Sequence, residues 1–366
     1  MFRPLWIEID LKALRNNFLT IRNHIERNVK IMAIIKQEAY GHGLIPIAKE
    51  LINLGVDFFG VGSLEEAISL RKADIKKPIL VLSSVFSKFS EYFIEYKITP
   101  TITNLEFAKN LDKVAKKFNV VVPVHIKVDT GMNRLGFSHL CVLNAIREMK
   151  KFSNLNLEGI FTHLSSAEEI DFTNYQINIF KNILENLKKV NINFKYIHCA
   201  NSLGIINYKD SHFNMVRPGL ILYGIKPIDN INFKLKPVLS LKSRIIFLKR
   251  VKKNTPIGYS RTFITEKDTN IATVACGYAD GYPVSLSNKA KVIIKNKFFN
   301  LVGRVCMDHI MVDLGNKTAS LGDEVILIGK DKDLIIKVED ISKIVNTIPY
   351  EIVSRLSLKI PRIYKT

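Results

Sequence analysis

The chain has 366 residues, of which 47% are hydrophobic and 24% are charged, and this is the composition of a globular protein with more than one domain. It excludes a disordered, a collagen-like and a disulfide-scaffold protein. The 54 Lys and Arg residues outnumber the 34 Asp and Glu residues, which gives a formal net charge of +20.

This positive charge is spread over every segment of the chain. The densest run, residues 249–253, lies beside a predicted strand and lacks the interleaved aromatic residues of a single-strand nucleic-acid binder. We therefore expect a solvated basic surface and neither a nucleic-acid nor a membrane partner, with nucleic-acid binding kept as an alternative. No segment reaches the ~18 apolar residues of a membrane span, and the N-terminus lacks the apolar core of a signal peptide. The four cysteines show no CxxC spacing, so we expect a cytoplasmic protein without a metal site.

Apolar, β-rich runs alternate with amphipathic stretches over the first two thirds of the chain. A helix capped by Asp10 comes first. The predicted strands then cover residues 30–35, 57–62, 79–83, 98–102, 120–128, 157–162, 196–200 and 214–216. The predicted helices between them include residues 46–54, 64–72, 105–118, 140–152 and 174–190. Such strands form a parallel sheet buried on both faces, and eight of them in about 220 residues favour a closed barrel over an open, doubly wound sheet.

The hydrophobic pattern changes after about residue 235. Apolar and polar residues alternate from Leu239 to Phe247, which is typical of an antiparallel strand with one buried face. Further strands are predicted at residues 292–295, 298–302, 310–314 and 325–328, and one helix at residues 338–345. The opening residues 5–9 also alternate and are expected to join this sheet. The sequence thus predicts a (β/α)8 TIM barrel over residues 10–235 and a mainly β domain made of residues 1–9 and 236–366.

Polar residues and glycines follow five of the predicted barrel strands, at the ends where the active sites of such barrels lie. They are Lys36, Tyr40, Lys127, Asp129, Arg134, His163, His198, Asn201, Ser202, Arg217, Gly219 and Leu220. A single lysine at a strand end is usually a surface residue, but five strands that supply such groups to one rim indicate a site. Ser202 and the backbone N–H groups of Gly219 and Leu220 suit a phosphate. A lysine opposite a phosphate indicates a Schiff base to pyridoxal 5′-phosphate.

Six segments in chain order resemble one enzyme family. They are AIIKQEAYGHG, VDTGMNRLGF, HCANS, VRPGLILYG, GYADGYP and GRVCMDHIMVDL. Together they make the chain similar to bacterial alanine racemases over nearly its whole length. The resemblance implies a fold-type III pyridoxal-phosphate enzyme, an isomerase that interconverts L- and D-alanine for peptidoglycan synthesis. It also implies a homodimer with shared active sites.

The resemblance assigns two residues to the proton transfers of a two-base mechanism. Lys36 binds the cofactor and serves one of its faces, and Tyr259 of the partner subunit serves the other face. Tyr278 is a rival for this role, but the corresponding family residue lines the substrate entrance. A phenol has a pKa of about 10, so Tyr259 needs nearby cations in order to ionise at neutral pH. Arg217 is implied to donate a hydrogen bond to the pyridine nitrogen, which leaves that nitrogen without a proton.

The remaining contacts are implied by the same likeness. The cofactor-binding residues are Lys36, Tyr40, His163, Asn201, Ser202, Arg217, Gly219 and Leu220. Arg134, whose guanidinium suits a carboxylate, binds the substrate together with Met307 of the partner subunit. The supporting residues are Lys127, His198, Tyr278, Arg304 and Asp308. Lys127 matches a lysine that is carbamylated in some members, and both its modified and unmodified forms remain open.

Two departures from the family pattern and three alternatives remain. Leu358 stands where members often have a phosphate-binding tyrosine, so one anchoring hydroxyl is expected to be lost. Gly258 and Ser260 differ from the commoner residues beside Tyr259.

A fold-type III decarboxylase or a broad-specificity racemase is one alternative function, and Cys306 is the candidate for the second catalytic group of such a decarboxylase. A non-catalytic cofactor carrier is another, but it would lack the β domain; the third is the nucleic-acid-binding role.

Overall fold

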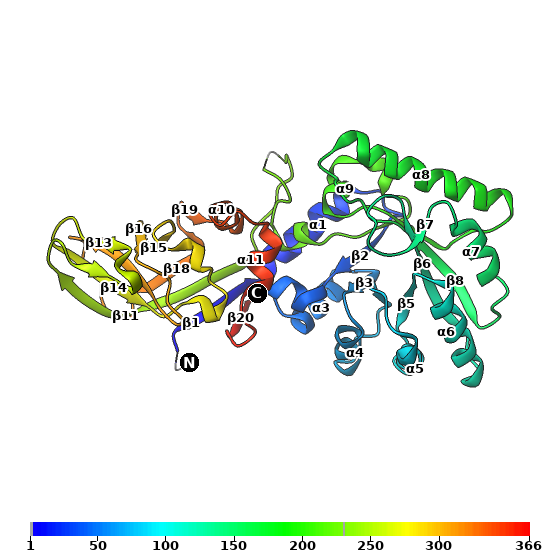
Figure 1. The fold of residues 1–366 in the computed structure, drawn as a ribbon, viewed down its shortest axis with the longest axis horizontal. Coiled ribbons are helices and arrows are strands. Elements are labelled where there is room, and N and C mark those ends of the chain that lie inside the picture. Colours follow the sequence, from blue (N-terminus) through cyan, green and yellow to red (C-terminus); the bar gives the residue numbers. More distant parts are fainter. Residues whose placement is uncertain (1–2, 230) are drawn as a thin grey trace.

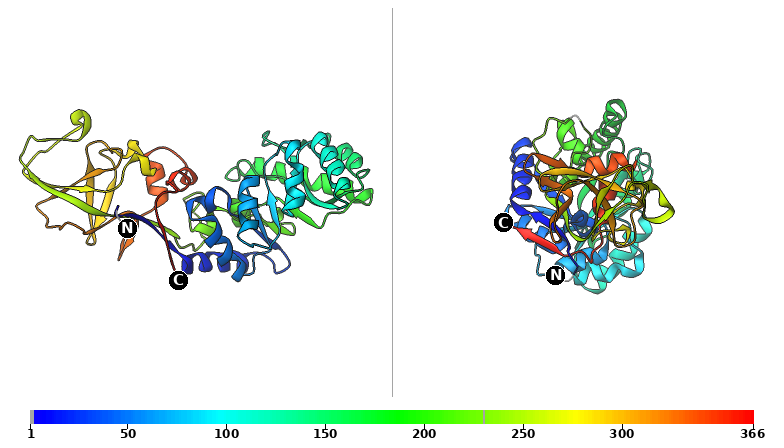
Figure 2. Two further views of the ribbon diagram at one scale, coloured as in Figure 1. Left: turned by 90° about the horizontal axis from the view of Figure 1, so that it is seen from below. Right: turned by 90° about the vertical axis from the view of Figure 1, so that its left-hand side faces the viewer.

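Two architectures lie end to end in the computed structural model, which describes residues 3–229 and 231–366 (Figure 1). A barrel surrounded by helices forms one end and a β domain forms the other, so the molecule is elongated in both side views (Figures 1 and 2). The chain starts in the β domain, where β1 (Leu5–Asp10) pairs with β11 (Leu239–Val251) and β20 (Arg362–Lys365). The predicted TIM barrel followed by a mainly β domain is confirmed.

Eight parallel strands close the barrel. They are β2 (Lys30–Ile34), β3 (Phe58–Val61), β4 (Ile79–Val81), β5 (Thr99–Ile102), β6 (Val122–Asp129), β8 (Leu155–Phe161), β9 (Tyr196–His198) and β10 (Met215–Val216). Closure follows from the pairing of β10 with β2 and of β5 with β6. The two-residue strand β7 (Phe137–Ser138) adds to β6. All eight predicted strands are confirmed, with ends that differ by at most two residues.

The helices cover the outside of the barrel. They are α1 (Leu11–His24), α3 (Leu44–Asn53), α4 (Leu64–Lys72), α5 (Ser90–Glu95), α6 (Leu105–Lys117), α7 (Val142–Met149), α8 (Ile170–Lys189) and α9 (Ser202–Asn207). The predicted cap is confirmed, since the Asp10 carboxylate accepts a hydrogen bond from the Ala13 backbone N–H at 2.9 Å. The buried residues of α1, such as Leu14, Phe18 and Ile21, lie on its face toward the core.

The β domain is a mainly antiparallel sheet that wraps around its own core. Its further strands are β14 (Thr269–Val274), β15 (Lys291–Ile294), β16 (Lys297–Val302), β17 (Ile310–Gly315), β18 (Glu324–Asp331) and β19 (Leu334–Ile336), with the short pair β12 (Pro256–Ile257) and β13 (Phe263–Ile264). Two helices, α10 (Val338–Ile344) and α11 (Pro349–Arg355), lead back to the barrel. The β15–β16 turn lies at Lys295 and Asn296, one residue before the gap between the predicted strands 292–295 and 298–302. Both turn residues adopt the positive φ that a two-residue hairpin turn requires.

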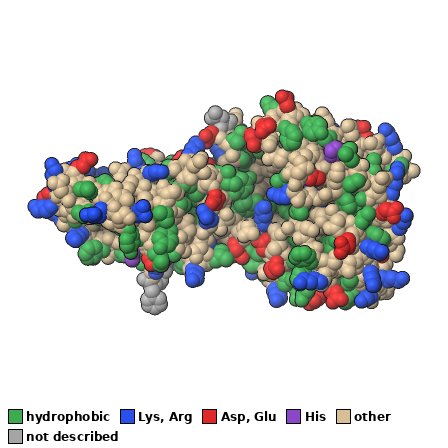
Figure 3. All heavy atoms as spheres, in the orientation of Figure 1, with side chains coloured by type: hydrophobic (Ala, Val, Ile, Leu, Met, Phe, Trp, Pro, Cys, Tyr) green, Lys and Arg blue, Asp and Glu red, His purple; other side chains and the backbone are tan. Residues whose placement is uncertain are grey.

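Charged side chains are scattered over the surface. On the face drawn in Figure 3, Lys and Arg side chains occur on both the barrel and the β domain and do not gather into one patch. Within residues 3–229 and 231–366, no helix is long and apolar enough to cross a membrane. The same residues contain no cluster of three or more His, Cys, Asp and Glu side chains that could hold a metal ion.

Candidate active site

A cavity of about 720 Å³ opens at the carboxyl ends of the barrel strands. Nine of the predicted site residues line it: Lys36, Tyr40, Lys127, Arg134, His163, Asn201, Ser202, Arg217 and Gly219. His198 and Leu220 are completely buried behind this lining. The barrel therefore brings together the strand-end residues that the sequence singled out.

Lys36 and Tyr40 reach the cavity through an unusual turn. The chain leaves β2 into α2 (Lys36–Gly41), where residues 37–40 all have φ between 51° and 55°. None of the four is a glycine, and a left-handed conformation costs such residues about 1–2 kcal/mol each. The surrounding structure must therefore hold this turn in place. We call residues 37–40 the left-handed turn.

The environment of Lys36 favours a reactive amine. Burial lowers the pKa of its ammonium group, and the nearby positive charge of Arg134 lowers it further, against an opposing effect of Glu66. A lowered pKa increases the fraction of neutral amine, which is the form that attacks a carbonyl group.

Hydroxyl groups converge on Gly219 at another part of the cavity wall. The Ser202 Oγ accepts a hydrogen bond from the Gly219 N–H at 3.0 Å. A Cβ atom at position 219 would lie only 2.9 Å from the Tyr40 hydroxyl, so the glycine allows this close approach. Two hydroxyls beside a backbone position that has no side chain are suited to hold a phosphate group.

A second tyrosine corrects the expectation for Leu358. Tyr350, on α11, lines the cavity, and its ring centroid lies 5.8 Å from that of Tyr40. Leu358 is 67% exposed and lies outside the lining. The expected loss of an anchoring hydroxyl was therefore wrong, because Tyr350 and not position 358 faces the cavity. The preceding Pro349, a residue common in the first turn of a helix, was the available signal.

Arg217 is held in one orientation beneath the cavity. Its side chain is buried, and its Nη2 donates to the Thr162 carbonyl at 2.7 Å and to the Cys199 carbonyl at 2.8 Å. The same nitrogen lies 3.2 Å from His163 Nδ1. Nη2 has two hydrogens for these three acceptors, so His163 Nδ1 can take part only as an acceptor that shares one of them. Burial, and after it the charge of Arg217, lowers the pKa of His163 and favours its neutral form.

A pair of buried histidines continues this network, and the sequence analysis missed one of them. Arg217 Nη1 donates to His198 Nδ1 at 2.8 Å, so His198 carries its proton on Nε2 and donates to His125 Nδ1 at 2.9 Å. Burial, and after it the charge of Arg217, lowers the pKa of His125 to about 3. A Cβ at Gly159 would lie 2.5 Å from the His125 ring, so this glycine leaves the space for the ring. His125 also lies within a strand, where a lone histidine is indistinguishable from an ordinary core residue.

The predicted residues of the β domain lie elsewhere. Tyr259 is 70% exposed and Met307 is 54% exposed, and neither lines the cavity; the same holds for Tyr278, Arg304 and Asp308. Tyr259 lies between β12 and β13, and β13 occupies the end of the β domain remote from the barrel (Figure 1). One chain therefore does not bring Tyr259 to Lys36.

Models of one protein family cover nearly all of the chain. The N-terminal domain of alanine racemase matches residues 9–227, and the C-terminal domain of alanine racemase matches residues 238–364. The chain belongs to the alanine racemase family. An alanine racemase from Halothermothrix orenii is 42% identical over 368 residues, which cover 99% of this chain and 97% of that protein.

Solved structures of alanine racemases share this architecture. The alanine racemase of Clostridium difficile 630 is 38% identical, covers 99% of this chain and 96% of its own, and gives a TM-score of 0.93. The alanine racemase of Bartonella henselae, a structure with covalently bound pyridoxal phosphate, is 30% identical, covers 99% of both chains and gives a TM-score of 0.90.

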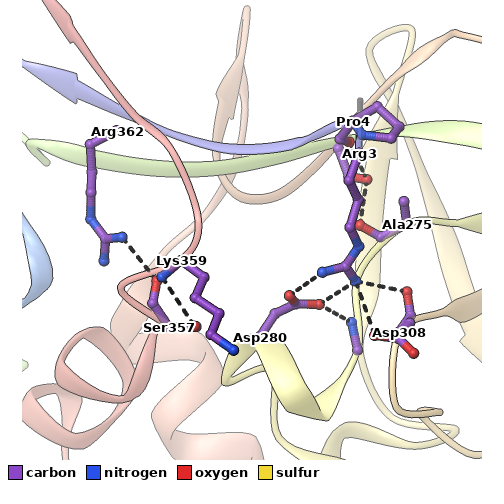
Figure 4. Close-up of polar contacts among 10 residues, drawn as sticks. Arg3, Pro4, Ala275, Asp280, Asp308, Ser357, Lys359 and Arg362 are labelled. Atoms are coloured by element: carbon purple, nitrogen blue, oxygen red, sulfur yellow. Dashed lines mark hydrogen bonds and ion pairs between the residues drawn. The ribbon is translucent and has the colours of Figure 1, made fainter. Parts of the chain in front are cut away.

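In this member of the alanine racemase family, Arg3 joins the loop of Asp280 to the loop of Asp308 (Figure 4). The first loop also carries Tyr278 and the second carries Met307. The Arg3 guanidinium forms an ion pair with Asp280, with one contact at 2.7 Å, and donates to the Asp308 carbonyl at 3.1 Å. Asp280 also accepts from the Gly277 backbone N–H at 2.8 Å. Two backbone hydrogen bonds, from residues 278 and 279 to the carbonyls of residues 306 and 307, fasten the loops to each other. Met307 and Tyr278 are thus presented together on the surface.

Proposed function

We propose that the protein interconverts L- and D-alanine in the cavity at the barrel mouth, with pyridoxal 5′-phosphate as its cofactor. The reaction follows from membership of the alanine racemase family. One observation supports the location above all: a half-buried lysine with a lowered pKa and two hydroxyls gathered on Gly219 face the same cavity. In cells, the product D-alanine would supply peptidoglycan synthesis.

The residues of the cavity fit this cofactor. Lys36 would hold its carbonyl carbon, while Tyr40, Ser202 and Tyr350 would meet its phosphate beside the backbone of Gly219. Arg217 can only donate, so it suits a ring nitrogen that accepts and carries no proton. When bound, the cofactor supplies an electron sink that acidifies the Cα–H of an amino acid.

The chain's own residues would bind the substrate and move the proton. Arg134, at the exposed edge of the cavity, offers a planar donor pair to the alanine carboxylate. Lys36 Nζ, once free of the cofactor, would take or return the Cα proton on one face. A second group must act on the opposite face, and no phenol other than those of Tyr40 and Tyr350 lines the cavity described here.

We further propose that Tyr259 of a second copy supplies this group. Tyr259 and Met307 are exposed on the β domain and lie outside the cavity of their own chain. An exposed tyrosine and methionine are typical of residues that become covered at an interface. A homodimer in which each β domain reaches the partner's barrel would complete both cavities, with Met307 at the substrate carboxylate.

The test is to incubate the purified protein with L-alanine and follow circular dichroism. The signal should decay to that of the racemic mixture, and Lys36→Ala should abolish this decay because the cofactor loses its covalent attachment. Lys30→Ala, at the opposite end of β2, is the matched control and should remain active. Release of carbon dioxide from ornithine or diaminopimelate, without racemisation of alanine, would show that a decarboxylase is the correct assignment.

A further inference from the structure

The C-terminal segment touches the backbone that directly follows the left-handed turn. A Cβ at Gly41 would lie 2.3 Å from the Val353 carbonyl oxygen of α11, and a Cβ at Gly43 would lie 2.0 Å from the Tyr364 hydroxyl of β20. Both glycines have positive φ, of 80° and 99°. Gly41 thus lets its segment pack against the backbone of α11, and Gly43 leaves the space for the Tyr364 side chain, each across more than 300 positions of sequence.

Two side chains of β20 make hydrogen bonds across this contact. Arg362 Nε donates to the Gly41 carbonyl at 3.1 Å, and the Tyr364 hydroxyl donates to the His42 carbonyl at 3.0 Å. Alternate residues of a strand share a face, so both side chains point to the turn while Ile363 and Lys365 are exposed on the other face.

Further hydrogen bonds fix the position of Arg362 and of β20. Arg362 is itself held by the carbonyls of Ser357 at 2.9 Å and Ile360 at 2.6 Å, and its link to the Ser357 region is visible in Figure 4. β20 pairs in parallel with β1, with Arg362 opposite Ile7 and Tyr364 opposite Ile9. The residues that bond to the Gly41 and His42 carbonyls are therefore part of the central sheet of the β domain.

Contacts made within residues 36–44 cannot fix the position of the turn, because they move with it. The His42 ring bonds to the carbonyls of Ala39 and Tyr40, and the Gly43 N–H donates to the Glu38 carbonyl at 2.8 Å. These bonds hold the local shape. The bonds from Arg362 and Tyr364 are different, since they join the segment to another part of the molecule.

We propose that Arg362 and Tyr364 are positioning residues that hold the left-handed turn so that Lys36 and Tyr40 meet the cofactor from fixed places. This role rests on the proposed function, because Lys36 and Tyr40 are the cofactor contacts named there. It makes the end of the chain part of the cofactor site, although neither side chain lines the cavity.

Two variants test this role in the holoenzyme. Tyr364→Phe removes one hydroxyl and keeps the ring, and Arg362→Gln removes the guanidinium. Amide hydrogen exchange of residues 36–43 should become faster by roughly fivefold or more in each variant, because lost hydrogen bonds ease local opening. The affinity for pyridoxal 5′-phosphate should fall severalfold. Lys365→Gln is the matched control on the opposite face of β20 and should change neither quantity.

The outcomes separate this role from a general structural one. Unchanged exchange at residues 36–43 in Tyr364→Phe would overturn the proposal, as would a loss of cofactor affinity that merely follows a lowered Tm. Normal exchange elsewhere in β20 and unchanged Tm would support it. If the wild-type protein fails to bind pyridoxal 5′-phosphate, the proposed function fails, whereas the exchange measurement still decides whether Arg362 and Tyr364 hold the turn.

Discussion

Lys127 combines burial with a position beside other cations. Its side chain is almost fully buried, and the pKa of its ammonium group falls from 10.5 to about 7, first because of burial and then because of Arg217. The only hydrogen bond that its side chain makes among the described residues runs from Nζ to the Val128 carbonyl at 3.2 Å. Much of this lysine is therefore a neutral amine near neutral pH, which is the form that adds carbon dioxide. The N–C bond of the carbamate forms as one proton leaves.

The pH dependence of stability checks this ionisation. In buffer free of carbon dioxide, we expect the free energy of unfolding of the wild type, relative to Lys127→Met, to rise with pH between about 7 and 10.5. In this window the unfolded lysine still binds a proton that the folded one has lost, so higher pH favours the folded state. A difference that stays flat across the window would contradict the lowered pKa. With bicarbonate present, native mass spectrometry should find the mass of one added carbon dioxide in the wild type and not in the variant.

At the level of residues, the sequence predicted which side chains line the cavity better than it predicted their hydrogen-bond partners. Lys36, Arg134 and Ser202 could be predicted because each follows a recognisable strand within a short loop, and all three line the cavity. His125 could not, because its role depends on a hydrogen bond to a residue 73 positions away. Tyr350 was overlooked for a similar reason, since the packing of α11 against the barrel decides which residue faces the cavity.

At the level of elements, periodicity predicted the strands, and local backbone conformation escaped prediction. Buried parallel strands are continuous apolar runs, so the eight barrel strands could be found from sequence. The left-handed turn could not, because residues 37–40 include no glycine and tertiary contacts impose their positive φ. β14 and α11 were also not singled out, although β16 and α10, of the same lengths, were predicted.

The loops joined by Arg3 offer a test at this scale. Arg3→Gln should lower the free energy of unfolding by about 1–2 kcal/mol, because charged hydrogen bonds are lost and the buried Asp280 keeps no cationic partner within residues 3–229 and 231–366. If Met307 contacts the substrate carboxylate, the KM for alanine should also rise while kcat changes less. Arg355→Gln, which removes an exposed ion pair with Glu351 on α11, is the matched control and should cost at most about 0.5 kcal/mol. A KM equal to that of the wild type would show that Arg3 does not position these loops for catalysis.

At the level of the whole molecule, the elongated shape separates the parts of the site. The cavity belongs to the barrel and α11, whereas Tyr259 lies next to β13 at the remote end of the β domain (Figure 1). A closed symmetric dimer presents the same two surfaces twice, so each barrel could receive the partner's β domain. The strand patterns predict the barrel and the β domain separately. They do not predict that Lys36 and Tyr259 of one chain lie far apart.

Subunit mixing tests the shared site directly. Lys36→Ala and Tyr259→Phe should each be severely impaired as homodimers, because each lacks one of the two proton-transfer groups. In a mixed dimer, however, one cavity combines the intact Lys36 of one chain with the intact Tyr259 of the other. Random exchange makes half of the dimers mixed, and one of their two cavities is intact, so roughly a quarter of the wild-type activity should return. Mixing Lys36→Ala with a Lys36→Ala/Tyr259→Phe double variant is the control, and it should restore nothing, because every cavity then lacks its lysine. If exchange is demonstrated by mass spectrometry and the first mixture stays inactive, Lys36 and Tyr259 do not meet across a dimer interface.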